Sequence, residues 1–319
     1  MNPFCSHVTD IAALGCQGWT SGQSRGVGGE SRRAKLLAQL LDDGQFETIE
    51  SARGFTTFTG EMKGVQVSIV ATGMVGRERM LRGSAGTGCD PEVVSGMSAG
   101  RAQHGLCRAG DESDRGRPMI IIRFGTCGAV RKEIAPGSVV VSGNGSVMIT
   151  RNPDAFFPDA TGEEYYRVSR VMPSSPALSK ACWQLVAAMN DKLGALRAEP
   201  IIAASIDRDA LSVFDGLNAT ACSFYSSQGR LDPAFDDRNE QLVENLTKTH
   251  QDLYTVEMET FHLLDLAQRS RGSIQATAAV LVVANRISGQ VVASDVLKRQ
   301  ESFWGQVILE TIAATPLQA

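Results

Sequence analysis

Apolar residues recur at two different spacings along the chain, and segments of the two kinds alternate from residue 119 onward. Short, nearly unbroken apolar runs are typical of buried strands, and they lie at 119–122, 137–142, 200–206 and 274–286. Apolar residues three or four positions apart are typical of amphipathic helices, and they predict helices over 175–194, 254–272 and 294–315. This alternation favours a layered α/β domain with a parallel or mixed sheet.

Capping residues indicate where these helices begin and end. Ser175 or Ser179 is the expected N-cap of the first helix, and Gly194 is its expected stop. The second helix is predicted to end near Gly272, and Asp295 is the expected N-cap of the last.

The N-terminal part adds one predicted helix and one hairpin. Residues 30–43 carry a stripe of leucines at helical spacing. Residues 55–72 read as two strands that are joined by a turn near Lys63 and Gly64, and the second strand alternates strictly.

Two segments differ from the rest of the chain in composition and in the spacing of their apolar residues. Residues 1–27 show no apolar strand, and residues 73–118 hold ten glycines, no aromatic residue and no sustained period, which is typical of a long loop or disordered insert. We predict one domain over 28–319, preceded by an atypical segment at 1–27 and interrupted by a Gly/Arg-rich insert at 73–118. The abrupt boundaries raise the hypothesis that both segments reflect an error in the gene model.

Composition and charge exclude several classes of function. Charged residues make up 21% of the 319 residues and the formal net charge is −4, which gives no basic surface for nucleic acid or membrane. No run approaches the roughly 20 apolar residues of a membrane span, and the first residues do not resemble a secretory signal. The seven cysteines are scattered without a CxxC pair, so neither a disulfide framework nor a zinc site is expected. We expect a reduced, soluble, cytoplasmic protein.

The clearest chemical signal is "MIIIRFGTCGAV", residues 119–130, where a buried strand runs into Arg123 and then into a small-residue turn at 125–128. A guanidinium in a core needs a counter-charge or acceptors. It is either paired with a buried carboxylate, or it faces an oxyanion beside the backbone of Gly125 and Thr126.

Three further stretches suit a phosphorylated or nucleoside-like ligand. "GGESRRAK" (28–35) places two glycines before a helix start, which favours an anion. "SFYSSQGRLDP" (223–233) places an aromatic pair before Gln228 and Arg230, which suits the amide–imide edge of a pyrimidine; taken alone, the stretch is also typical of a surface turn with a packed aromatic. "TVEMET" (255–260) offers two carboxylates, either as first-turn acids or as acceptors for vicinal hydroxyls.

Together these stretches resemble the nucleoside phosphorylase superfamily, and within it the members that cleave uridine. The resemblance rests on "RFGTCG", "FYSSQGR" followed by "LD", "VEMET" and "ANR" over about 119–315, and on "GGESRRAK" and "ARGFTTFTG" over about 28–72. It implies a three-layer α/β/α fold around a central mixed, twisted sheet.

The resemblance also implies roles for three groups of residues. Phosphate is expected at Gly29, Arg33, Arg123 and Thr126, with Arg53 reaching the phosphate of a neighbouring subunit. The base is expected at Phe224, Gln228, Arg230 and Arg286. The ribose is expected at Glu257, Met258 and Glu259, with Glu259 on its hydroxyls and His7 donated by the partner chain.

The implied activity is the reversible phosphorolysis of uridine to uracil and ribose 1-phosphate in pyrimidine salvage. Inorganic phosphate is the co-substrate, no metal or other cofactor is implied, and the site requires at least a homodimer. Purine-specific relatives carry a Ser-Asp after the strand that matches 279–286, and no Asp stands there in this chain. Alternatives are a phosphorylase of broader specificity, a nucleosidase that uses water, or a catalytically impaired nucleoside-binding relative.

Two positions depart from the pattern of the superfamily. Cys127 stands where many members have Thr or Ser, which removes a hydroxyl contact. Ser226 and Ser227 replace a pair that usually contains glycine, which is expected to stiffen the base loop.

Overall fold

A computed structural model describes residues 11–15, 32–50, 56–71, 119–175, 179–200 and 211–315. Within these residues, strands form one mixed sheet of 12 strands, in the order β2-β3-β4-β1-β5-β11-β10-β7-β8, with β12, β6 and β9 branching from β5. Their bounds are β1 Ile11–Gly15, β2 Phe46–Glu50, β3 Thr56–Met62, β4 Val65–Ala71, β5 Met119–Ala129, β6 Val139–Val141, β7 Ser146–Arg151, β8 Tyr166–Val168, β9 Val213–Asp215, β10 Leu217–Ala221, β11 Leu253–Glu257 and β12 Ile274–Asn285.

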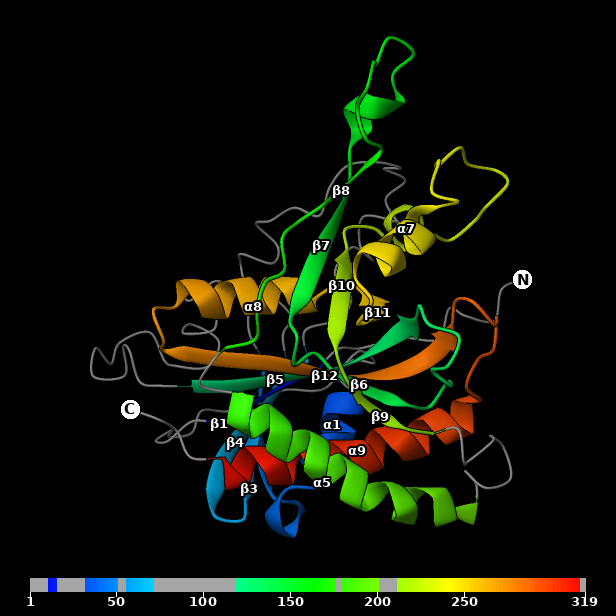
Figure 1. Cartoon of the computed structure of the whole chain (residues 1–319). Helices are drawn as coiled ribbons and strands as arrows, with labels where there is room; N and C mark the ends of the chain where they lie inside the picture. Colours follow the sequence, from blue (N-terminus) through cyan, green and yellow to red (C-terminus); the bar gives the residue numbers. More distant parts are fainter. Residues whose placement is uncertain are drawn as a thin grey trace.

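Helices cover both faces of the sheet, which confirms the predicted three-layer α/β/α fold (Figure 1). One face is covered by α1 (Arg32–Ala38), α5 (Ser179–Ala198) and α9 (Ser294–Ala314). The other is covered by α8 (Thr260–Arg269), while α7 (Leu242–Thr249) lies beside the short 3-10 helix η7 (Ser226–Gln228). The remaining 3-10 helices are η2 (Asp42–Gly44) and η4 (Pro153–Phe156).

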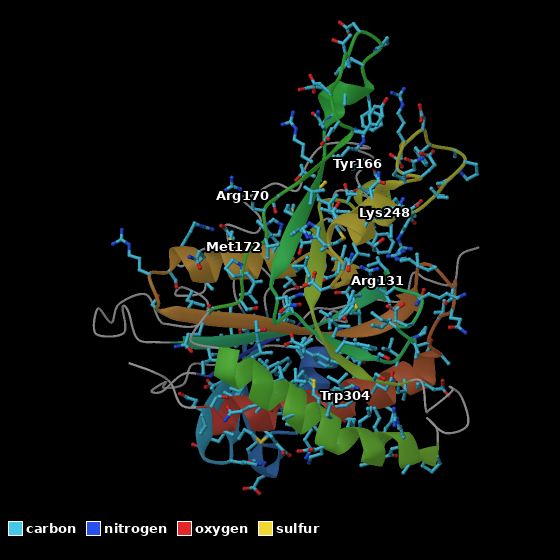
Figure 2. The ribbon with its side chains drawn as sticks, in the orientation of Figure 1. Arg131, Tyr166, Arg170, Met172, Lys248 and Trp304 are labelled. Atoms are coloured by element: carbon cyan, nitrogen blue, oxygen red, sulfur yellow. The ribbon has the colours of Figure 1, made fainter. Side chains whose placement is uncertain are left out.

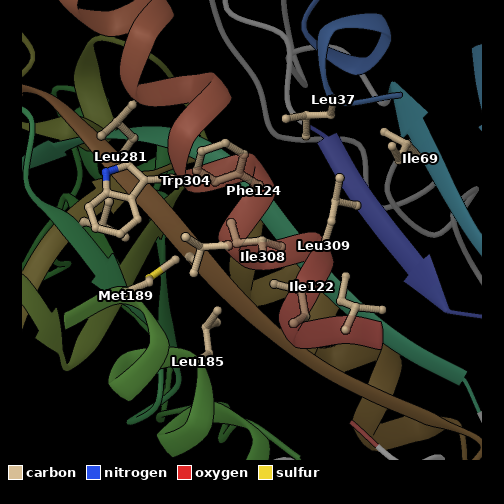
Figure 3. Close-up of a cluster of buried hydrophobic side chains, with 14 of the residues drawn as sticks. Leu37, Ile69, Ile122, Phe124, Leu185, Met189, Leu281, Trp304, Ile308 and Leu309 are labelled. Atoms are coloured by element: carbon tan, nitrogen blue, oxygen red, sulfur yellow. The ribbon is translucent and has the colours of Figure 1, made fainter. Parts of the chain in front are cut away.

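The larger core lies between the sheet and α1, α5 and α9. Trp304 of α9 is 1% exposed and is surrounded by Leu281, Phe124 and Met189 from three other elements (Figure 3). Successive residues of β5 alternate between the two faces, so Ile120, Ile122 and Phe124 belong to this core while Ile121 packs under α8. Arg123 follows the same alternation and therefore lies on the α8 face.

Several predicted elements are confirmed. The 55–72 hairpin is β3 and β4, with Lys63 and Gly64 at positive φ in the turn. The runs at 137–142 and 274–286 contain β6 and β12, and the last predicted helix is α9. The predicted helix over 30–43 is shorter, as α1 ends at Ala38.

Several details of the sequence interpretation are wrong. The N-terminal segment contains a strand, β1, which pairs with β4 on one side and β5 on the other, so two neighbours stabilise a run too short to be predicted. The turn expected at 125–128 is part of β5, because β12 pairs with β5 from Met119 to Ala129. Asp295 lies inside the first turn of α9, whose N-cap is Ala293.

The other two helices also begin or end elsewhere than predicted. Residues 253–257 form β11 between β5 and β10, since Tyr254, Thr255 and Val256 favour a strand and the helix begins only at Thr260. Helix α5 starts at Ser179 and continues past Gly194, because Leu193 and Leu196 on either side are buried. Residues 201–206 of the predicted strand over 200–206, and the insert at 73–118, lie outside the described residues.

Candidate active site

The sheet opens beside the middle of β5. On one edge of this strand β1 pairs as far as Phe124, and β11 pairs with Gly128 and Ala129. Between them, residues 125–127 have no partner strand on that edge among the residues that the structure describes. The opening, by which we mean this interruption in strand pairing, falls at the stretch that the sequence singled out, between Arg123 and Gly128, and residues 125–127 are themselves buried.

Arg123 lies at this opening and is bound by two carboxylates. Its Nη1 lies 2.9 Å from Oε2 of Glu257, and its Nη2 lies 2.8 Å from Oε2 of Glu259. Nη1 also donates to Oγ1 of Thr260 at 3.3 Å. The Arg123 side chain is 5% exposed, so Arg123 forms the buried ion pair that was one of the two alternatives predicted from the sequence. Its partners are the two acids that were expected to contact the ribose.

Glu257 is surrounded by donors of the chain itself. Its side chain is 2% exposed. Five groups reach its oxygens at 2.7 to 3.2 Å, namely Nδ2 of Asn218, Oγ1 of Thr220, the backbone N–H groups of Glu259 and Thr260, and Nη1 of Arg123. These five donors fill the roughly four acceptor positions of an ionised carboxylate. Glu257 therefore holds Arg123 and the start of α8, and Glu259, with 12% of its side chain exposed, is the better placed acid for a ligand.

The four residues expected at the base come together at η7 and the end of β12. Nη2 of Arg286 donates to Oε1 of Gln228 at 2.5 Å. The guanidinium carbon of Arg230 lies 4.0 Å from the ring centroid of Phe224, a cation–π contact. Gln228 is 4% exposed. The side chains that were expected to read a pyrimidine edge thus form one cluster.

Burial lowers the pKa of both arginines in this cluster. Desolvation lowers the pKa of Arg230 to about 10, and desolvation together with the charge of Arg230 lowers the pKa of Arg286 to about 9. Both remain cations at neutral pH. Two partly buried like charges close to one another favour a ligand on which negative charge builds up.

Side-chain hydrogen bonds hold the base loop in place. Ser226 bonds to the Tyr166 hydroxyl at 2.7 Å, and Ser227 bonds to Sγ of Cys222 at 3.0 Å. Asn239 donates to the backbone carbonyls of Ser226 and Arg230, at the two ends of the loop. Tyr166 begins β8, on the projecting arm formed with β7 (Figures 1 and 2). The two serines add anchoring contacts that glycine could not make.

Two glycines are needed where the base cluster meets the fold. Gly229 follows Gln228 with φ 63°, a left-handed conformation that lets the chain turn toward Arg230. Gly128 of β5 lies against the guanidinium of Arg286, and a Cβ there would overlap its Nε. Gly128 is five positions after Arg123, so the strand that carries Arg123 also contacts the base cluster.

The structure does not bring Arg33 to this site. Its Nη2 lies 2.6 Å from Oε1 of Glu301, and both side chains are buried between α1 and α9, on the opposite face of the sheet from Arg123. Arg32, the preceding residue, is exposed. Thr126 lies on β5 at the opening and Met258 is 5% exposed between the two acids. Gly29, Arg53 and His7 lie outside the described residues.

Sequence reasoning missed the residues that support the site. Asn218 and Thr220 occupy alternate positions of β10 and contact Glu257, and their signal was two polar residues at i and i+2 in an apolar run. Arg131 donates to the carbonyls of Leu253, Thr247, His250 and Gln251, and so fixes the end of α7, the helix that carries Lys248 (Figure 2). No local sequence pattern predicted this role of Arg131.

Comparison with known proteins agrees with this geometry. The family model for the phosphorylase superfamily matches residues 26–308. The chain belongs to the phosphorylase superfamily. A solved structure from a study of two uridine phosphorylases of the oomycete Phytophthora capsici is 66% identical, with a TM-score of 0.76 and 90% of each chain covered. A search of curated proteins finds no match.

More distant superfamily structures share the fold. A Trypanosoma brucei nucleoside phosphorylase that shows uridine phosphorylase activity is 20% identical with a TM-score of 0.59, over 89% of this chain and 91% of that one. The uridine phosphorylase of Schistosoma mansoni, in complex with thymine, is 17% identical with a TM-score of 0.56, over 90% and 85%.

The described residues offer neither a membrane-spanning helix nor a metal-binding cluster. No helix in those ranges has the length and apolar character to cross a bilayer. Among the same residues, no cluster of three His, Cys, Asp or Glu side chains is arranged to hold a metal ion.

Proposed function

We propose that this phosphorylase-superfamily member is a uridine phosphorylase, a pentosyltransferase that converts uridine and phosphate into uracil and ribose 1-phosphate. The observation that carries the proposal is the cluster in which Arg286 bonds to Gln228 beside Arg230 and Phe224. The 66% identity to a structure from a study of uridine phosphorylases supports the same substrate.

The base cluster has the chemistry that a departing pyrimidine needs. In phosphorolysis the bond from C1′ to N1 breaks, its electron pair goes to the base, and the sugar gains oxocarbenium character. Arg230 and Arg286 stabilise the charge on the base, and Gln228 supplies an amide donor and acceptor for its polar edge. Phe224 offers a ring face for stacking.

Phosphate and ribose are assigned to the other half of the opening. Phosphate is already anionic, so its oxygen attacks C1′ without a general base, and positioning supplies the rate. In this proposal Arg123 and Thr126 hold phosphate, and Glu259 accepts hydrogen bonds from the ribose hydroxyls beside Met258. Gly29 completes the phosphate site in the same proposal.

The proposal extends to assembly and setting. A homodimer or higher homo-oligomer would bring Arg53 and His7 of one subunit to the site of another. The enzyme would act in pyrimidine salvage in the cytoplasm, with inorganic phosphate as co-substrate and without a metal or organic cofactor.

Product analysis tests the substrate. Uridine, thymidine, inosine and guanosine are each incubated with the enzyme and phosphate, and bases and sugar phosphates are separated by chromatography. The proposal expects uracil and ribose 1-phosphate in equal amounts from uridine, with little release of purine base. Equal rates on uridine and inosine would instead favour the broader-specificity phosphorylase, and binding of uridine without turnover would favour the impaired relative.

A further inference from the structure

A buried network of polar side chains, which begins on β10, supports Arg123. Parallel pairing of β10 with β11 sets Thr220 beside Glu257 and Asn218 beside Thr255, and pairing with β7 sets Asn218 beside Ser146. Asn218 and Thr220 are two positions apart, so both side chains leave the strand on the same face as Glu257. Of these side chains, only Glu257 was expected from the sequence to meet a ligand.

The hydrogen bonds of this network have a definite direction. Thr255 donates to Oδ1 of Asn218 at 2.8 Å, which turns the amide so that its Nδ2 donates to Oε1 of Glu257 at 2.7 Å. Thr220 donates its hydroxyl proton to the same oxygen at 2.7 Å and accepts from the backbone N–H of Phe261 at 2.8 Å. A carboxylate can only accept, so both contacts to Oε1 are donated by β10. Nδ2 of Asn218 also lies 3.0 Å from Oγ of Ser146, the shortest of its three contacts being the one to Glu257.

The other oxygen of Glu257 is thereby left for the cation. Its Oε2 lies 2.9 Å from Nη1 of Arg123 and accepts from the backbone N–H groups of Glu259 and Thr260. Asn218, Thr220 and Thr255 are each fully buried. Loss of a donor on the Oε1 side would leave a buried carboxylate short of partners and free to rotate.

We propose that Asn218 and Thr220 are positioning residues, which hold the Glu257 carboxylate so that it fixes the Arg123 guanidinium at the phosphate and ribose end of the opening. The inference rests on the proposed function, since it assigns Arg123 to phosphate. Glu257 and the two β10 side chains do not touch the ligand. They set the position of the group that does.

A matched pair at position 220 separates positioning from folding. Thr220→Ser keeps the hydroxyl, and Thr220→Val keeps the shape but removes the donor. The inference expects the KM for phosphate to rise about tenfold or more in Thr220→Val and to stay within about twofold in Thr220→Ser. A merely structural role would lower the melting temperature and the amount of active enzyme while the KM for phosphate stayed unchanged, and that result would overturn the inference.

Asn218→Asp supplies a second readout with a distinctive pH profile. The introduced carboxyl group would donate to Glu257 only when it carries a proton, so kcat/KM for phosphate should recover as pH falls from about 8 to about 5.5, relative to wild type. An Asn218→Asp profile parallel to that of the wild type would contradict the inference.

Calorimetry that measures phosphate binding in the absence of uridine separates this test from the test of the proposed function. A wild-type protein that binds phosphate but releases no uracil would contradict the function only. Weaker phosphate binding by Thr220→Val than by Thr220→Ser would still support the positioning role. Equal binding by the two variants, or no phosphate binding by wild type, would overturn it.

Discussion

Arg286 donates a hydrogen bond of 2.5 Å to Oε1 of Gln228, and this bond joins the end of β12 to the loop at η7. The two residues are 58 positions apart in the sequence. Because the bond orients the Gln228 amide, its loss should weaken recognition of the base and not of phosphate.

Gln228→Leu removes the acceptor of Arg286 and the amide that would meet uracil. We expect kcat/KM for uridine to fall about 10- to 100-fold, the equivalent of one hydrogen bond to a charged group. The KM for phosphate should change little. Steady-state kinetics with each substrate varied in turn measures both, and Gln241→Leu, at an exposed glutamine, is the control. A large rise in the KM for phosphate would show that Gln228 belongs to the phosphate site and would contradict its assignment to the base.

Gly128→Ala tests the close approach between β5 and Arg286. The added Cβ overlaps the guanidinium, so Arg286 must move away from Gln228, and the KM for uridine should rise about tenfold or more. Gly194→Ala is the matched control, because its Cβ meets nothing within 4 Å and the residue lies inside α5. That variant should keep wild-type kinetics and gain about 0.5–1 kcal/mol of unfolding free energy. Unchanged kinetics in Gly128→Ala would show that Arg286 is not held against this strand.

Arg33→Leu separates stability from phosphate binding. Removing one partner of the buried pair with Glu301 should cost about 3–5 kcal/mol of unfolding free energy in urea titrations. The folded variant should keep the wild-type KM for phosphate, whereas Arg123→Leu should abolish turnover. Lys248→Ala, which breaks an exposed pair with Glu244, should leave the urea midpoint nearly unchanged. A stable Arg33→Leu variant with a raised KM for phosphate would restore the phosphate role that the resemblance implies.

His262 gives the fold a dependence on acid. Burial lowers its pKa below the ordinary value of 6.5, although the charges of Glu257 and Asp265 oppose this shift. As pH falls below 6.5 the unfolded chain takes up a proton that the folded protein resists, so this residue's contribution to stability is lost on acidification.

The urea midpoint of the wild type should therefore fall more between about pH 7.5 and about pH 5.5 than that of His262→Gln, which carries no titrating group there. Equal losses in the two proteins would show that His262 titrates normally in the fold.

The sequence predicted the layered fold and most of the base site because those signals are local. Strands such as β12 are long apolar runs, and Phe224, Gln228 and Arg230 stand within seven residues, so the loop that carries them needs only a short turn to bring them together. Arg286 was predicted only through the resemblance, since it lies 56 positions after Arg230 and only the sheet joins them.

The remaining errors have a common physical cause, which is that tertiary partners decided the outcome. β1 forms because β4 and β5 pair with it on either side. β11 forms between β5 and β10, although the apolar residues that follow it are spaced as in a helix. The resemblance assigned both Arg33 and Arg123 to phosphate, and only the packing of α1 against α9 gives Arg33 its partner, Glu301. The support from Asn218 and Thr220 is visible only once β10 lies beside β11.

The most direct test of the central claim is uracil release from uridine, followed by absorbance, with and without inorganic phosphate. The account predicts rapid release that depends on phosphate, saturates with it, and yields ribose 1-phosphate in step with uracil. Release at the same rate without phosphate, with free ribose as the product, would contradict phosphorolysis and assign the protein to the nucleosidases.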